Sequence, residues 1–173
     1  AAFCGTTELS NALVDAHKQG KLLPLVSTLD PNLDEAMAYK VQKEYVTKRL
    51  QGDTIAGFKA GLTTTAGQKK FGVSGPVAGV LYGSGKLTGS PVIYSQGFAA
   101  LMVETEIAFQ AGRAISKPVK SVAELKRAFR SALPSIELPG GAISWAAGTQ
   151  WRQTETRGLP IGEEEDIMIA ASE

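Results

Sequence analysis

The sequence changes character near residue 53, and this change constrains the fold more than any other feature. Before it, apolar residues recur at the three- and four-residue spacing of amphipathic helices. After it, short β-prone runs are broken by glycines, as in TIAGFKAGLT and GPVAGVLYGSGK. Helices that precede strands instead of alternating with them are typical of the α+β class. We therefore expect a single domain over 1–173, with a helical segment over 7–52 and a β-rich segment over 53–173.

Two helices are predicted in the first segment. Leu9 and Leu13 mark the apolar face of a helix over roughly 7–19. A second helix should begin after Asp30 and end at Gly52, because glycine is a common stop signal. The apolar stripe of this second helix comprises Leu33, Met37, Val41 and Tyr45.

A third helix is predicted inside the β-rich segment, over SVAELKRAFRSAL. Ser121 and Glu124 have the spacing of a capping box, and Val122, Leu125 and Phe129 supply an apolar side. PSIELP follows it as a short strand between prolines. After Gly140 the pattern is weak, and we expect mostly loop with short strands.

Composition excludes several classes of protein. Lys and Arg number 18 against 17 Asp and Glu, so the net charge of +1 gives no reason to expect nucleic acid or an anionic membrane as a partner. The single Cys4 and single His17 exclude an internal disulfide and zinc sites built from Cys and His. No apolar run has the length of a membrane span, so a cytoplasmic protein is the default expectation.

The stretch LMVETEIAF places two negative charges on a predicted strand. Because side chains alternate with a period of two, Glu104 and Glu106 share one face, while Val103, Ile107 and Phe109 lie on the other. The apolar face is expected to pack on a core. The glutamate face is either solvated or supplies two oxygen ligands to a hard cation such as Mg²⁺ or Mn²⁺, which needs a further carboxylate from elsewhere.

Lys59 is the other residue whose surroundings suggest chemistry. On a strand it shares a face with Gly57 and Gly61, so the side chains that would crowd the ammonium are missing on both sides. This space accommodates a ligand, and partial loss of solvent would lower the pKa of the amine toward an acid/base range. The alternative interpretation is an ordinary exposed lysine on an edge strand.

Common nucleotide and hydrolase motifs are absent from the sequence. GSGK over 83–86 fails as a phosphate loop, since Val80 replaces the first glycine and Leu87 replaces the final hydroxyl. No G-x-S-x-G elbow is present, and His17 falls in the last turn of the first predicted helix, which makes a serine triad improbable.

Several motifs together resemble a known family. The run GFKAGLTTTAGQKKFGVSGPVAGVL over 57–81, followed by VETEIAF and then PSIEL, resembles the 2-keto-4-pentenoate hydratase and 4-oxalocrotonate decarboxylase branch of the fumarylacetoacetate hydrolase superfamily. AYKVQ over 38–42 is similar to the amino-terminal helix of the family, so the resemblance runs from about Leu9 to Leu138. It implies an α+β fold in which amino-terminal helices precede a mixed, β-rich roll of the fumarylacetoacetase carboxy-terminal-domain type, here without its last part.

The resemblance also implies a site and an activity. It implies a lyase of aromatic catabolism that hydrates or decarboxylates small 2-oxo or 2-hydroxydienoic acids with Mg²⁺ or Mn²⁺, in a homo-oligomer or together with a related chain. Lys59 would assist proton transfer. The other implied site residues are Glu104, Glu106 and Glu137 for the metal, and Gly57, Gly61 and Leu62 for the substrate.

Two other functions remain open at this stage. One is a catalytically silent member of the same fold that binds a small acid or assembles with a partner. The other is a hydrolase of carbon–carbon bonds in acylpyruvates, a branch that uses a His–Glu pair to activate water. The position of His17 in the amino-terminal helix disfavours this hydrolase.

Overall fold

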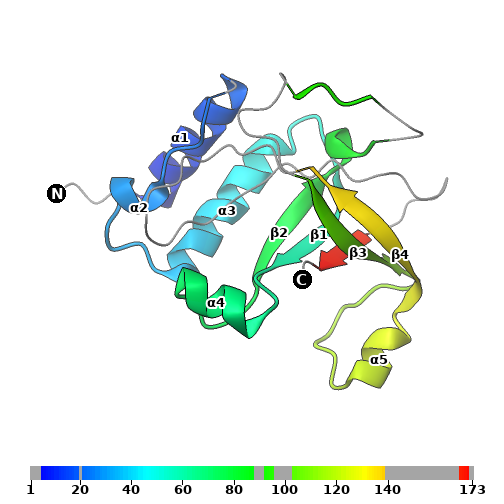
Figure 1. Ribbon diagram of the computed structural model, residues 1–173. Helices are drawn as coiled ribbons and strands as arrows, with labels where there is room; N and C mark the ends of the chain where they lie inside the picture. Colours follow the sequence, from blue (N-terminus) through cyan, green and yellow to red (C-terminus); the bar gives the residue numbers. More distant parts are fainter. Residues whose placement is uncertain (1–4, 20, 88–91, 96–102, 139–167, 172–173) are drawn as a thin grey trace. The chain divides into compact units, whose positions relative to one another are not determined.

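The computed structural model describes residues 5–19, 21–87, 92–95, 103–138 and 168–171. The chain divides into two compact units. One unit contains the amino-terminal helices, and the other contains a five-stranded sheet with short helices in its connections (Figure 1). That the whole chain forms a single domain stays a prediction.

The helical unit contains three described helices. α1 spans Thr6–Lys18, which confirms the first predicted helix, and a short α2 that the pattern did not predict spans Val26–Leu29. α3 spans Glu35–Arg49. It begins later than expected because Asp34 is its cap, with a side-chain oxygen that accepts a hydrogen bond of 2.7 Å from the amide of Met37.

α1 and α3 pack through an apolar cluster with a polar network beside it. Ser10 is fully buried, and its hydroxyl lies 3.1 Å from a carboxylate oxygen of Glu44 and 2.6 Å from the Lys48 ammonium. These contacts satisfy a buried hydroxyl that would otherwise destabilise the unit. The apolar cluster comprises Leu9, Leu13, Val14, Leu23, Val41 and Tyr45.

None of the described helices is long and apolar enough to cross a membrane.

The sheet unit is built on five described strands in the order β2-β1-β5-β3-β4 (Figure 1). β1 and β5 are parallel, whereas the other neighbouring pairs are antiparallel. β2 and β4 are therefore the edges of the described sheet. The strands are β1 Ile55–Gly61, β2 Val77–Tyr82, β3 Glu104–Ala111, β4 Phe129–Glu137 and β5 Met168–Ala171. The helices between them are α4 Thr65–Phe71, the 3₁₀ turn η1 Gly83–Gly85 and α5 Val122–Lys126.

The third predicted helix is wrong in its second half. Ser121 caps α5 as expected and accepts a hydrogen bond of 3.1 Å from the Glu124 amide, but the helix ends at Lys126. The chain from Phe129 onward instead pairs with β3, and the ring of Phe129 lies 5.2 Å from that of Phe109. This long-range pairing outweighs the local helical pattern. Pro134 is tolerated within β4 because β4 is an edge strand.

α4 lies in the β-rich segment between two β-prone runs, where the sequence pattern predicted no helix. Its cap is Thr64, whose hydroxyl accepts a hydrogen bond of 3.1 Å from the amide of Gly67. The helix ends at Gly72, which has a φ of 67° that glycine adopts without steric cost. The segment between Gly140 and residue 167, expected to be mostly loop, lies outside the described residues.

We predict that Leu9→Ala will destabilise the helical unit by about 2–5 kcal/mol, because Leu9 is fully buried between α1 and α3 and its loss leaves a cavity. Leu29→Ala is the matched control, since that side chain is 40% exposed. Urea denaturation followed by circular dichroism measures both. Equal losses in the two variants would show that Leu9 is not part of a packed core.

Candidate metal centre

Three carboxylates converge on one face of the β3–β4 pair. Glu104 lies directly opposite Glu137 in the antiparallel register, and Glu106 follows two residues later on the same face of β3. Each of the three offers a carboxylate oxygen that lies within 4.8 Å of the others. The structure thus brings together the three glutamates that the family resemblance implied. It is the only such cluster of potential metal ligands among the described residues.

The glutamate face is the buried face of β3. Glu106 is 7% exposed and Glu137 is 4% exposed, whereas Glu104 is the most exposed of the three. On the opposite face, Val103 is 65% and Ile107 is 47% exposed. The expectation that the apolar face of β3 packs on a core is therefore wrong for the described residues. A freely solvated glutamate face is excluded as well, since two of the carboxylates have lost most of their water.

Lys59 forms an ion pair with Glu137. The side chains are 16% and 5% exposed, so the pair is largely removed from solvent. Lys59 lies on β1, which has β2 on one side and β5 on the other. The alternative interpretation of Lys59 as an exposed residue on an edge strand is therefore wrong.

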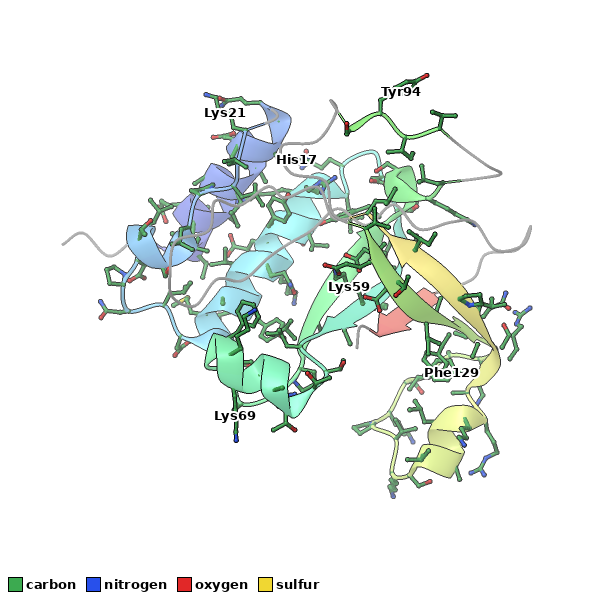
Figure 2. All side chains as sticks on the ribbon, in the orientation of Figure 1. His17, Lys21, Lys59, Lys69, Tyr94 and Phe129 are labelled. Atoms are coloured by element: carbon green, nitrogen blue, oxygen red, sulfur yellow. The ribbon has the colours of Figure 1, made fainter. Side chains whose placement is uncertain are left out.

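This ion pair requires a strongly curled sheet. β5 and β3 lie between β1 and β4 in the hydrogen-bonding order, so Lys59 and Glu137 are three strand steps apart. In a flat sheet three steps measure about 14 Å, which is farther than a lysine side chain extends. Twist and curling bring the two strands together across one face, where the side chain of Lys59 can be followed in Figure 2. The lysine and the three glutamates therefore share the concave face.

The electrostatics of the cluster are unbalanced without a cation. Burial raises the pKa of Glu106 to about 7, with repulsion from Glu137 and Glu104 adding to the effect and Lys59 opposing it. When all four groups are ionised, three carboxylates and one ammonium leave two net negative charges. The described structure gives the buried Oε2 of Glu106 no hydrogen-bond partner.

The donor set fits a hard divalent cation. All three ligands are carboxylates, the oxygen donors that Mg²⁺ and Mn²⁺ prefer. A buried oxygen without a partner is costly unless something binds it, and the Oε2 of Glu106 is such an atom. A charge of +2 would also neutralise the net charge of the four groups. The residues present therefore suit the cation that the resemblance implied.

The predicted substrate residues lie along β1 and at its end. Gly57 and Gly61 share the face of Lys59, and Gly57 is buried. Leu62 follows the strand with a φ of 54°, the one positive φ found at a non-glycine residue in the described ranges. Such a conformation costs free energy and is often retained at functional sites. Nothing in the sequence indicated this positive φ at Leu62.

Sequence reasoning missed Gly79, which lies opposite Lys59 in the β1–β2 register. A β-carbon at this glycine would lie 3.0 Å from Cγ of Lys59. The signal that could have found it is a glycine in the interior of the β-prone run VAGVLY, where glycine weakens a strand unless a close contact requires it.

Comparisons with known proteins show what this chain resembles. No family model matches the chain. The chain is 34% identical over 136 residues to the TodF product hydratase of Pseudomonas putida, covering 78% of this chain and 51% of that protein. It is 33% identical over 111 residues to 2-keto-4-pentenoate hydratase 2 of Dechloromonas aromatica, covering 64% of this chain and 42% of the relative.

A solved structure of 4-oxalocrotonate decarboxylase from Pseudomonas putida G7, complexed with magnesium and adipate, matches with a TM-score of 0.78 at 20% identity. The match covers 89% of this chain and 61% of that one. The chain is similar in sequence to members of the 2-keto-4-pentenoate hydratase and 4-oxalocrotonate decarboxylase branch of the fumarylacetoacetate hydrolase superfamily.

These similarities confirm the resemblance seen in the sequence, and the structural match confirms a fold that mixes helices and strands. The chain spans about half the length of the curated relatives that it matches. That the roll is incomplete at its carboxy-terminal end stays a prediction.

We predict that the metal-free protein will lose stability as the pH rises from about 5 to 8. Glu106 has its pKa raised from 4.5 to about 7 in the folded chain, so between these values the folded state holds a proton that the unfolded state has released. The stabilisation is therefore complete below the lower value and lost as the pH passes the upper one. Melting temperatures recorded in EDTA across this range measure it.

Glu106→Gln supplies the control for this pH dependence. The amide keeps the size of the side chain but does not titrate, so the melting temperature of this variant should fall less over the same range. If both proteins showed the same slope, the destabilisation would have to come from groups other than Glu106.

Proposed function

We propose that this chain carries the site of a divalent-metal-dependent hydratase or decarboxylase that acts on small 2-oxo or 2-hydroxydienoic acids. The observation that carries the proposal is the convergence of Glu104, Glu106 and Glu137 on a concave sheet face, with a buried, unpartnered oxygen on Glu106 and a lysine beside Glu137. An arrangement of hard oxygen ligands next to one ammonium suits the stabilisation of negative charge on an organic acid.

The relatives support the same reaction class. The TodF product hydratase and a 2-keto-4-pentenoate hydratase are named for hydration, and the matching solved structure is named for decarboxylation. That solved structure was determined with magnesium and adipate, a dicarboxylate. The same pairing of a divalent cation with a small organic acid is what we propose for this chain.

Different residues of this chain would bind the cation and the acid. Glu104, Glu106 and Glu137 would hold Mg²⁺ or Mn²⁺ on the concave face. When bound, the cation supplies a Lewis acid that stabilises negative charge on an oxygen of the substrate. Gly57 would leave room for the acid against β1, whereas at Gly61 a β-carbon would lie 3.2 Å from Cγ2 of Val77, so that side chain takes up the space.

Lys59 would hold and move the proton. Its Nζ lies at Glu137 in a largely buried position, so a substrate that reaches the three carboxylates also reaches the ammonium. Delivery of a proton from Nζ to the far carbon of a dienol, with loss of the enol hydroxyl proton to water, would produce an unsaturated ketone. In a hydratase this ketone would then add water. In a decarboxylase the carbon–carbon bond to a carboxylate would break instead, releasing carbon dioxide and leaving the electron pair on the dienolate.

Binding of Mg²⁺ or Mn²⁺ in the millimolar range should raise the melting temperature by several degrees, since a ligand of the native state stabilises it by mass action. Glu106→Gln should lose most of this shift, because one charged ligand is removed. Glu35→Gln deletes the charge of an exposed residue on α3 and should retain the full shift. Differential scanning fluorimetry measures all three proteins. A shift of equal size in Glu106→Gln would show that these carboxylates do not bind the cation.

Hydration is tested with 2-hydroxypenta-2,4-dienoate, whose loss is followed by its ultraviolet absorbance with and without Mg²⁺ or Mn²⁺. Decarboxylation is tested separately with an unsaturated 2-oxo dicarboxylate, because the dienoate has no second carboxylate to lose as carbon dioxide. We expect metal-dependent turnover of one of these acids, and Lys59→Met should lower it by roughly 10²–10⁴-fold because the proton donor is lost. Folded protein that binds the metal but leaves both acids unchanged would instead be a silent binding member of this kind of protein.

Assembly is the remaining expectation. A homo-oligomer, or an assembly with a related chain, stays a prediction that light scattering at several protein concentrations tests.

A further inference from the structure

Gly79 lies where the aliphatic stem of Lys59 crosses the neighbouring strand. The two residues are directly opposite in the antiparallel β1–β2 register. A β-carbon built on Gly79 would lie 3.0 Å from Cγ, 3.4 Å from Cδ and 3.9 Å from Cε of Lys59. Three successive carbons of the lysine therefore run close past the backbone of this glycine.

A side chain at position 79 would conflict with this path. A contact of 3.0 Å to a β-carbon is tighter than nine in ten real ones, so the lysine stem would have to shift by a few tenths of an ångström. The conflict involves Cγ, at the root of the side chain, so a small movement of the ammonium alone cannot relieve it. Glycine also weakens the interior of a strand, and its presence in β2 calls for a compensating contact such as this one.

We propose that Gly79 is a positioning residue for Lys59. Because Gly79 has no side chain, the lysine stem can lie against β2. The ammonium then reaches Glu137 on β4 across the same concave face. The consequence for metal binding rests on the proposed function of the three carboxylates. The contact between Gly79 and Lys59 itself does not depend on the proposed function.

The sign of the effect on Mg²⁺ affinity follows from the charges. The Lys59 ammonium shares Glu137 with the proposed cation site, so it opposes the binding of a second cation there. Moving the ammonium away should tighten Mg²⁺ binding by roughly three- to tenfold, the size expected for partly screened charges in one site. Gly79→Ala should therefore tighten Mg²⁺ binding although position 79 carries no ligand.

A double-mutant cycle tests the proposal in the full chain. Gly79→Ala is made in the wild type, in Lys59→Ala, which removes the stem, and in Lys59→Met, which keeps a stem without the charge. Urea midpoints and Mg²⁺ affinity by calorimetry are measured for each. In the wild type, Gly79→Ala should lower the midpoint and tighten Mg²⁺ binding. In Lys59→Met only the lower midpoint should persist, and in Lys59→Ala both effects should vanish.

Gly112→Ala is the matched control. Its β-carbon would lie 3.3 Å from Cβ of Arg130, a similarly tight contact that does not involve Lys59. Its effect on the midpoint should be the same in every background, with no effect on Mg²⁺ affinity. An equal midpoint loss for Gly79→Ala with and without the lysine stem would overturn the proposal.

Two further outcomes remain decisive. If Gly79→Ala folds only in the Lys59→Ala background, the contact is supported, and if it unfolds in both backgrounds, the proposal is overturned. If the wild type does not bind Mg²⁺, the proposed function fails, while the urea cycle still decides whether Gly79 acts on Lys59.

Discussion

The ion pair between Lys59 and Glu137 is the contact on which the site depends. It joins β1 to β4 although β5 and β3 lie between them in the sheet, so it can form only when the sheet curls. The curl gives the sheet a concave face, and every residue assigned to the metal or to proton transfer lies on that face. A flatter sheet with the same strands and the same register would keep Glu104 opposite Glu137 but would separate both from the lysine.

Crowding of like charges is the cost of this arrangement. Desolvation and two neighbouring carboxylates raise the pKa of Glu106 to about 7, and one of its buried oxygens has no hydrogen-bond partner in the described structure. Lys59 compensates for only part of this charge. Isolated buried charges are unfavourable unless they are paired, so stability and cation binding are expected to be linked in this protein. The linkage makes the site testable even in the absence of turnover.

The two faces of β3 show how a candidate functional site can be recognised in a sheet. In an ordinary sheet the apolar face is buried and the charged face is solvated. Here Val103 and Ile107 are exposed, whereas Glu106 is buried. Inversion of the usual pattern at a pair of glutamates is expected where function, and not packing, determines which residues occupy a buried face.

The sequence by itself determined the features that depend on local spacing. The strand period of two placed Glu104 and Glu106 on one face, and helical spacing located α1. The GFKAGL, VETEIAF and PSIEL motifs carried the family resemblance, which pointed to the three carboxylates that the structure brings together. Tertiary structure decided what depends on partners distant in the chain. Pairing with β3 turned the residues after Lys126 from an expected helix into strand β4, and curling brought Lys59 to Glu137 and its stem to Gly79. Burial of a strand face and strand order arise from contacts between distant segments, and local periodicity carries no information about them.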